Sequence, residues 1–231
     1  IIEPEPYLPA PLRKKGSVRL HDSQSLVAYT TDHMTAATHI YADVDEATFV
    51  SVLDDHGSVD GPGWAQHRAT LVLHRTPEWQ HWLSHDGQYL AQTAFAEHVE
   101  DGLSEIVSPP AADLLEIAQS FRATTNVEFK TDKRLASGQH QLTYVETIDA
   151  KAGARGDLSV PESLVLSIAP YEGMEPAEVK ARVRFRLKDG HLSIGYKIDH
   201  PDRVERAAFA VVAGHIQSAT GITPLMGTPR A

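Results

Sequence analysis

The sequence predicts an α+β fold, with a mainly antiparallel sheet built from two hairpins and covered by helices over residues 77–124 and 203–218. Two segments alternate apolar and polar residues on both sides of a short turn, which is the period of strands with one buried face. Other segments repeat apolar residues at the three- and four-residue spacing of helices. With 231 residues, of which 42% are hydrophobic, the chain is long enough to bury an ordinary core.

The clearest pattern lies between residues 179 and 199. Apolar residues at odd positions alternate with basic residues at even positions, and Asp189-Gly190 then supplies the two residues that a type I′ turn favours. A two-residue turn fixes the register, so that Phe185 faces Ile194 and all apolar residues fall on one side. The predicted hairpin therefore has an apolar face and a cationic face. The basic side chains of the cationic face are Lys180, Arg182, Arg184, Arg186, Lys188 and Lys197.

The second hairpin and the helices follow from similar patterns. Residues 127–135 and 141–148 are strand-like runs separated by a short polar turn. Thr76-Pro77 is a strong helix start, because threonine caps the helix and proline occupies a first-turn position where its missing N–H costs nothing. A second helix, predicted over residues 88–107, carries an acidic polar side. A third is predicted to follow to about residue 124.

The domain organisation is predicted to be simple. Residues 1–16 contain four prolines and end in a basic cluster, a composition that favours an extended arm. The arm is either a plain tail or a segment that lies on a neighbouring subunit. Residues 17–231 contain no repeat and no long linker, so they are expected to form a single α+β domain.

Composition narrows the class of protein. The net charge of -10 argues against a protein whose whole surface attracts nucleic acid, so any basic face must be local. The absence of cysteine excludes disulfides and thiolate metal sites. No apolar run approaches the roughly 18 residues that span a bilayer, and the start does not resemble a charged leader. A cytoplasmic protein without a membrane partner is expected.

Besides an uncommitted solvated face, the cationic face has two interpretations. Arginines at every second position of a strand, opposite Ser193 and the side-chain-free Gly195, are suited to forked hydrogen bonds with phosphate or nucleobase oxygens. Alternatively, the carboxylates of the acidic helix over residues 88–107 cover this face, within one subunit or across an oligomer interface. Both interpretations are open at this point.

Two other groups of residues suggest chemistry. His81 and His85 are four residues apart, a spacing that can place two imidazoles on one helix face for a metal. Asp54-Asp55-His56 lies in a glycine-bordered loop and, with His67, defines an alternative reading as a metal-dependent hydrolase. In both cases an ordinary structural role is the competing interpretation. No nucleophile-elbow, phosphate-loop, dinucleotide-binding or calcium-loop motif occurs, and no cofactor or metal is predicted.

The ordered series of short motifs resembles one known family. The segments that carry the resemblance are Gly16-Ser17-Val18-Arg19, Val52-Leu53-Asp54-Asp55-His56-Gly57, Gly61-Pro62-Gly63-Trp64, Thr76-Pro77-Glu78-Trp79 and Ala181-Arg182-Val183-Arg184-Phe185-Arg186. In this order they resemble the YfdQ-like family of phage and prophage proteins. The resemblance implies a phage-encoded protein in the cytoplasm of a bacterial host, and it assigns no catalytic residue.

The sequence thus predicts a non-enzymatic phage or prophage accessory protein. It is expected to self-associate and to bind an anionic partner, either nucleic acid or a nucleotide-like ligand, through the cationic face. One alternative is a self-assembling structural subunit that uses the basic face and the arm for intersubunit contacts. The other alternative is the metal-dependent hydrolase built on Asp54-Asp55-His56.

Overall fold

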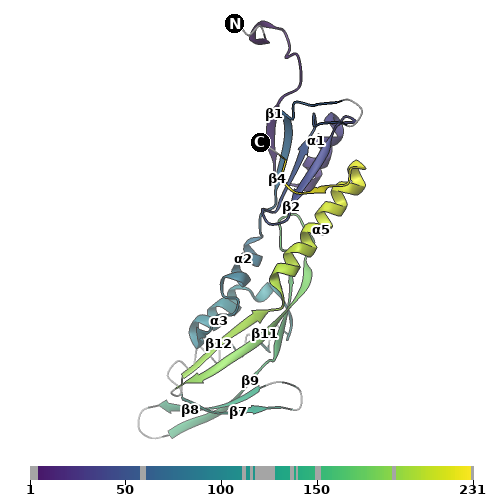
Figure 1. Ribbon diagram of the computed structural model, residues 1–231. Coiled ribbons are helices and arrows are strands. Elements are labelled where there is room, and N and C mark those ends of the chain that lie inside the picture. Colours follow the sequence, from purple (N-terminus) through teal and green to yellow (C-terminus); the bar gives the residue numbers. More distant parts are fainter. Residues whose placement is uncertain are drawn as a thin grey trace. The chain divides into compact units, whose positions relative to one another are not determined.

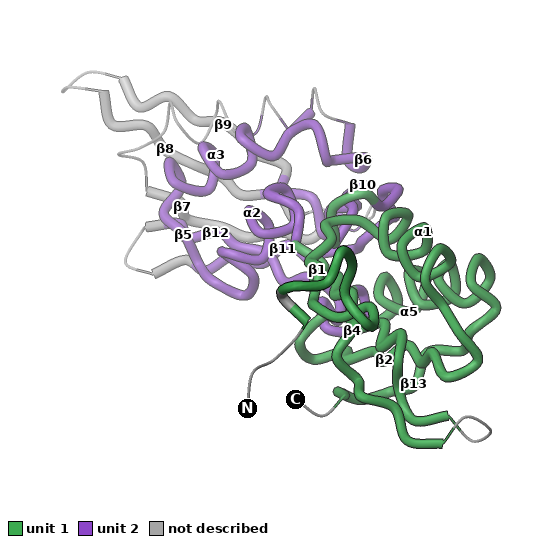
Figure 2. Tube along the Cα trace, turned by 90° about the horizontal axis from the view of Figure 1, so that it is seen from above, with its two compact units in different colours: residues 1–74, 171–173, 205–231 green, residues 75–170, 174–204 purple. Residues whose placement is uncertain are grey.

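The computed structural model (Figure 1) describes residues 5–57, 61–110, 113–114, 117, 128–135, 138, 140–148, 152–188 and 191–229. Contacts between residues group the chain into two compact units (Figure 2). The first unit comprises residues 1–74, 171–173 and 205–231, and the second comprises residues 75–170 and 174–204. Because grouping by contacts does not measure cooperative unfolding, the single domain over residues 17–231 and the arm over residues 1–16 stay predictions.

The first unit is built on a five-stranded mixed sheet. In spatial order its strands are β1 (Gly16–Leu20), β4 (His67–Val72), β3 (Thr48–Val52), β2 (His39–Asp43) and β13 (Leu225–Met226). The two outer pairs of strands are parallel and the two inner pairs are antiparallel. On β3, Phe49 and Ser51 are buried while Thr48 and Val50 are partly exposed, so one face of this sheet is covered.

Two helices supply the cover of the mixed sheet. Helix α1 (Ser23–His33) begins where the Asp22 side chain accepts a hydrogen bond from the Ser25 N–H at 2.7 Å. Helix α5 (Pro201–Thr220) confirms the helix predicted over residues 203–218. Its Phe209 ring stacks on Phe49 with centroids 4.4 Å apart. From residue 205 on, α5 therefore covers the mixed sheet, and only its first turn, with Val204, packs against the core of the hairpin unit, where the sequence predicted the whole helix.

The second unit contains the cationic hairpin. Its five-stranded sheet has the spatial order β5 (Leu90–Ala91), β12 (His191–Ile198), β11 (Ala177–Lys188), β10 (Ser163–Ile168) and β6 (Ile106–Ser108). All neighbouring strands in this sheet are antiparallel. The register of β11 with β12 is the predicted one, from Lys188 opposite His191 to Ala181 opposite Ile198. The turn residues Asp189 and Gly190 lie outside the described residues.

Helices α2 (Pro77–Ser84) and α3 (Gln92–Asp101) cover the apolar side of the hairpin sheet. Thr76 caps α2 by accepting the Trp79 N–H, as predicted. The side chains of Trp79, Trp82 and Phe95 lie in one buried cluster with Ile194 and Tyr196 of the hairpin. This cluster is the core of the second unit.

The helix predicted over residues 88–107 is shorter than expected. Residues 90 and 91 pair with β12 instead, and Gly102 ends α3 before the turn η2 (Leu103–Glu105). Gly102 is required there, because a β-carbon would lie 2.7 Å from the Trp82 ring. Of the third predicted helix, residues 113, 114 and 117 are helical, and the rest lies outside the described residues.

A third sheet contains the second predicted hairpin. Strands β7 (Glu128–Arg134), β8 (His140–Ile148) and β9 (Ala152–Val160) are antiparallel in the order β7-β8-β9. The α+β class and both hairpins are therefore confirmed. The two hairpins lie in different sheets, whereas the sequence predicted one sheet built from both. The β11–β12 hairpin is flanked by β10 and β5, and the second hairpin pairs with β9.

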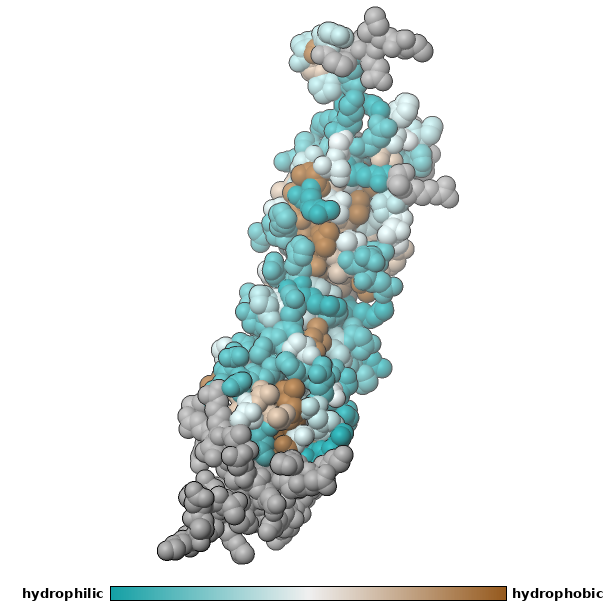
Figure 3. All heavy atoms as spheres, turned by 90° about the vertical axis from the view of Figure 1, so that its left-hand side faces the viewer, coloured by the Kyte–Doolittle hydropathy of each residue, from teal (hydrophilic) through white to brown (hydrophobic). Residues whose placement is uncertain are grey.

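Figure 3 colours one face of the protein by the hydropathy of its residues. On the face drawn in Figure 3, hydrophilic residues predominate and hydrophobic residues form separate patches. In the arm, the turn η1 (Glu5–Tyr7) is joined to Lys15 by an ion pair between Glu5 and Lys15 at 2.6 Å. Within the part of the chain that the structure describes, no helix is long and apolar enough to cross a membrane.

Candidate functional site

The β11–β12 hairpin separates apolar and charged side chains. Val179, Ala181, Ile194, Tyr196 and Ile198 are all buried against α2 and α3. The residues between them point to the opposite side, because successive side chains of a strand alternate. We call this opposite side the cationic face. Its members are Lys180, Arg182, Arg184 and Arg186 of β11 and Ser193, Gly195, Lys197 and Asp199 on and after β12.

Four cationic side chains form a row along β11. Lys180, Arg182, Arg184 and Arg186 are all exposed. Residues on the same face of a strand are about 6.8 Å apart, so the row extends over about 20 Å. The Lys188 backbone lies in the register expected for the same row, and its side chain lies outside what the structure describes.

Two of the residues that flank the row are serines. Ser163 of β10 pairs with Arg182, and Ser193 of β12 pairs with Arg186. Because serine is short, the longer basic side chains extend beyond their neighbours. The hydroxyl groups add hydrogen-bond donors and acceptors beside the row.

Two of the basic groups are paired within the chain. The Arg182 Nε donates to Asp199 at 3.0 Å, and both side chains remain well exposed, at 64% and 41%. The Lys197 ammonium bonds Asp86, whose carboxylate also accepts the Ile198 N–H at 2.7 Å. Lys197 is partly buried, whereas the four basic residues of the row on β11 are exposed, and its ion pair with Asp86 helps to hold residues 86–91 on β12.

The other members of the row differ in their partners. The Arg186 guanidinium carbon lies 4.4 Å from the centroid of the Tyr89 ring, a cation–π contact. Lys180 and Arg184 have no hydrogen-bond or ion-pair partner among the described residues. Exposed pairs such as Arg182–Asp199 contribute at most about 1 kcal/mol, so a phosphate can displace the carboxylate.

Gly195 has a structural role within the chain. A β-carbon built on Gly195 would overlap the Gln88 carbonyl oxygen. The glycine therefore allows the protein's own segment at Gln88 to approach β12 closely. The sequence could not show this, because the partner lies more than 100 residues away.

The acidic helix does not cover the cationic face within the chain. Phe95, Ala96 and Val99 of α3 lie in the apolar cluster with Ile194, on the other side of the sheet. Among the described side chains, the carboxylates that pair with basic groups of the hairpin are those of Asp86 and Asp199. Coverage of the face by another copy of the chain stays a prediction.

His81 and His85 belong to a stacked group around the buried His98. The rings of His81 and His98 are 4.1 Å apart and nearly parallel, and the His85 ring lies 4.6 Å from His98. The His98 Nε2 bonds the Tyr196 hydroxyl at 2.8 Å, and this hydroxyl donates to the Trp82 carbonyl. Burial, with smaller effects of His81 and His85, lowers the pKa of His98 to about 3. Burial also raises the pKa of Tyr196 far above its usual range.

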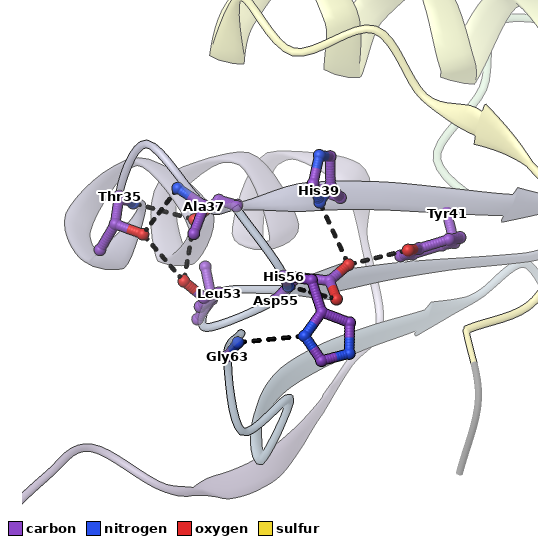
Figure 4. A network of polar contacts seen from close by, with 9 residues as sticks. Thr35, Ala37, His39, Tyr41, Leu53, Asp55, His56 and Gly63 are labelled. Carbon is purple, nitrogen blue, oxygen red and sulfur yellow. Dashed lines mark hydrogen bonds and ion pairs between the residues drawn. The ribbon is translucent and has the colours of Figure 1, made fainter. Parts of the chain in front are cut away.

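The Asp54-Asp55-His56 loop forms a network of internal hydrogen bonds (Figure 4). One Asp55 oxygen accepts from His39 Nδ1 at 3.1 Å and from the Tyr41 hydroxyl at 2.8 Å, and the other accepts the His56 N–H. Although burial acts in the opposite direction, bonds from Tyr41, His56 and His39 lower the pKa of Asp55. The carboxylate is thus an acceptor that ties β2 to the loop.

Asp54 and His56 close the rest of the loop. Asp54 accepts the N–H groups of Gln66 and His67, and His56 Nδ1 accepts the Gly63 N–H at 3.0 Å. A β-carbon on Gly63 would lie 2.2 Å from the Asp55 carbonyl oxygen, so the loop requires glycine there. In the described part of the chain, no three His, Asp or Glu side chains are arranged to hold a metal. The hydrolase stays a prediction that this geometry does not favour.

The fold and the cationic face define a class: an α+β protein with two compact units and a basic strand face on an acidic molecule. The chain belongs to the family described as uncharacterized conserved protein, DUF2303, whose model matches residues 2–229. Comparisons with curated proteins and with solved structures found no match. The family match does not address a phage origin, which stays a prediction.

Proposed function

We propose that this protein is a non-enzymatic accessory protein that binds an anionic partner, nucleic acid or a nucleotide-like ligand, through the cationic face. The observation that supports this most strongly is the β11–β12 register, which puts Lys180, Arg182, Arg184 and Arg186 on one exposed face. Guanidinium groups at this spacing are suited to bidentate bonds with successive phosphates.

The charge distribution supports a local anion site. The chain as a whole carries a net charge of -10, so an anion is repelled by most of the molecule. Among the side chains that the structure describes on this side of the hairpin sheet, five are basic and three are carboxylates, those of Asp86, Asp199 and Glu178. A net positive patch on an acidic protein restricts binding to one surface and disfavours nonspecific association elsewhere.

Self-association is a second part of the proposal. In the arm, Tyr7 is 83% exposed and Leu12 is 75% exposed. Apolar side chains on a proline-rich segment gain stability when they are buried against another surface, and a second copy of the chain supplies one. The structural-subunit alternative uses the same arm and predicts an oligomer without nucleic-acid binding.

The biological setting is the third part of the proposal. The YfdQ-like resemblance supports a phage or prophage origin and therefore the cytoplasm of a bacterial host. In that compartment nucleic acid is an abundant polyanion, in line with the cationic face.

The test compares two triple variants. We expect Arg182, Arg184 and Arg186, changed together to serine, to abolish salt-sensitive binding of a fluorescein-labelled oligonucleotide in an anisotropy titration. The matched control changes the exposed Arg19, Arg203 and Arg206 of other elements to serine, which alters the net charge by the same amount. Binding unchanged in the first variant, or weakened equally in both, contradicts the proposal. Circular dichroism of both variants checks that the fold is retained.

A further inference from the structure

The segment that crosses the cationic face is held in place at several points. Its Gly87 N–H donates to the Tyr196 carbonyl at 2.8 Å, and Asp86 bonds both Lys197 and the Ile198 N–H. Residues 90 and 91 then pair with β12 as strand β5. Because the segment is fixed on both sides of Gln88, the position of the next residue, Tyr89, is preorganised.

Tyr89 forms an aromatic platform at one end of the basic row. The Arg186 guanidinium lies over the ring at 4.4 Å, and 38% of the residue remains exposed. An exposed ring backed by a guanidinium is suited to stacking with a nucleobase, since the arginine covers one ring face and its charge strengthens the contact. Tyr89 thus adds to the anion site a group that recognises something other than phosphate.

The shape of the cationic face disfavours double-stranded DNA. The hairpin lies in a sheet of five strands, so about 19 Å separates the outer strands, whereas the major groove of B-DNA is about 12 Å wide. In addition, the 86–89 segment lies on the face over Gly195 and blocks insertion of the hairpin into a groove. The base edges of a duplex are therefore out of reach.

A single strand has no such restriction. Its phosphates can follow the row of Lys180, Arg182 and Arg184, and its bases are free to turn toward an aromatic ring. At about 3.4 Å per stacked nucleotide, the full row from Lys180 to Arg186, about 20 Å long, matches about six nucleotides. This is within the size of the sites that sheet-based single-strand binders use, roughly 4 to 16 nucleotides.

We propose that the ligand of the cationic face is a single-stranded nucleic acid, with its phosphates on Lys180, Arg182 and Arg184 and one base stacked on Tyr89. This inference rests on the proposed function and specifies its ligand. It also gives Arg186 a separate role, because this arginine supports the aromatic ring rather than a phosphate.

The experiment measures anisotropy with labelled 12-nucleotide oligothymidylate, a 12-base-pair duplex, and an abasic 12-mer. We expect the wild-type protein to bind oligothymidylate at least tenfold more tightly than the duplex. Tyr89→Ala should weaken oligothymidylate binding roughly 5- to 150-fold, the usual effect of removing one stacking ring, while Tyr89→Phe stays within about twofold of wild type. The abasic strand should bind both Tyr89→Phe and Tyr89→Ala with the same low affinity.

The outcomes separate this inference from the proposed function. Equal binding of duplex and oligothymidylate, both lost in the Arg182/Arg184/Arg186 triple variant, overturns the single-strand inference and leaves the anion site standing. If Tyr89→Ala binds oligothymidylate as tightly as the wild type does, the stacking role of Tyr89 is overturned. No binding of any of the three probes at low salt overturns both proposals. If Tyr89→Ala does not fold, the wild-type protein tests the stacking role, because equal affinity for oligothymidylate and for the abasic strand overturns it.

Discussion

The stability of this protein should fall steeply between neutral and mildly acidic pH because of His98. This imidazole is 5% exposed and lies against His81, His85 and Tyr196. The Tyr196 hydroxyl donates its proton to the Trp82 carbonyl, so the His98 Nε2 must carry a proton and donate to the hydroxyl oxygen. The neutral ring satisfies this geometry, and a second proton would put a charge into the core.

The magnitude follows from the two pKa values of His98. In the unfolded chain the pKa is about 6.5, and in the folded protein burial lowers the pKa to about 3. Between these values the unfolded state binds one more proton than the folded state, so stability rises with pH and is lost as the pH falls below about 6.5. From pH 7.5 to pH 5.0 the loss from this one group is about 2 kcal/mol.

The assay is urea unfolding of the wild type and of His98→Gln at both pH values. Glutamine retains an N–H donor for the Tyr196 hydroxyl but does not titrate. We expect the free energy of unfolding of the variant to fall by about 2 kcal/mol less than that of the wild type over this pH range. An equal loss in the two proteins refutes the reasoning, since the loss would then arise from other groups.

Three further predictions concern packing and the anion site. Gly195→Ala should lower the free energy of unfolding by about 1–3 kcal/mol in urea, because its β-carbon overlaps the Gln88 carbonyl, whereas the control Gly214→Ala has open space and should be neutral or stabilising. Asp86→Asn should release the Lys197 ammonium and steepen the salt dependence of oligonucleotide binding by about 0.7 in log–log slope, and an unchanged slope contradicts this. Phe209→Ala should lower the free energy of unfolding by about 3–5 kcal/mol, because the ring stacks in the core; a loss below 1 kcal/mol contradicts the packing.

The hairpin could be predicted from the sequence because its determinants are local. The alternation along β11 and the two-residue connection at Asp189-Gly190 together fix which residues face each other, and the observed register agrees at every pair. The start of α2 is predictable for the same reason, since Thr76 and Pro77 act on adjacent backbone groups. Short-range rules suffice for both elements.

Features that depend on distant residues could not be predicted. Asp86 pairs with Lys197 across 111 positions, and His98 bonds Tyr196 across 98. The sequence patterns of α5 and of the strands show which faces are apolar, but not that Phe209 meets Phe49 rather than the hairpin. In the same way, the sequence does not show that Gly195 lies against the Gln88 carbonyl.

The ends of α3 show how tertiary structure shortens a periodic segment. Helical spacing continues from residue 88 to residue 107, yet Leu90 and Ala91 gain backbone bonds by pairing with β12. At the other end, Ile106 is buried as part of β6 beside β10. Both ends of the predicted helix therefore form strands, β5 and β6, that pair at the two edges of the sheet.

The central claim is that a polyanion binds along β11, and lysine footprinting tests it most directly. Lys180 is exposed and has no partner among the described residues, whereas the exposed Lys15 of the arm is paired with Glu5. Acetylation of the wild-type protein, read by mass spectrometry with and without saturating oligothymidylate, should show Lys180 protected several-fold and Lys15 unchanged. A Lys180 that stays equally reactive while the oligonucleotide is bound would place the ligand elsewhere and contradict the account.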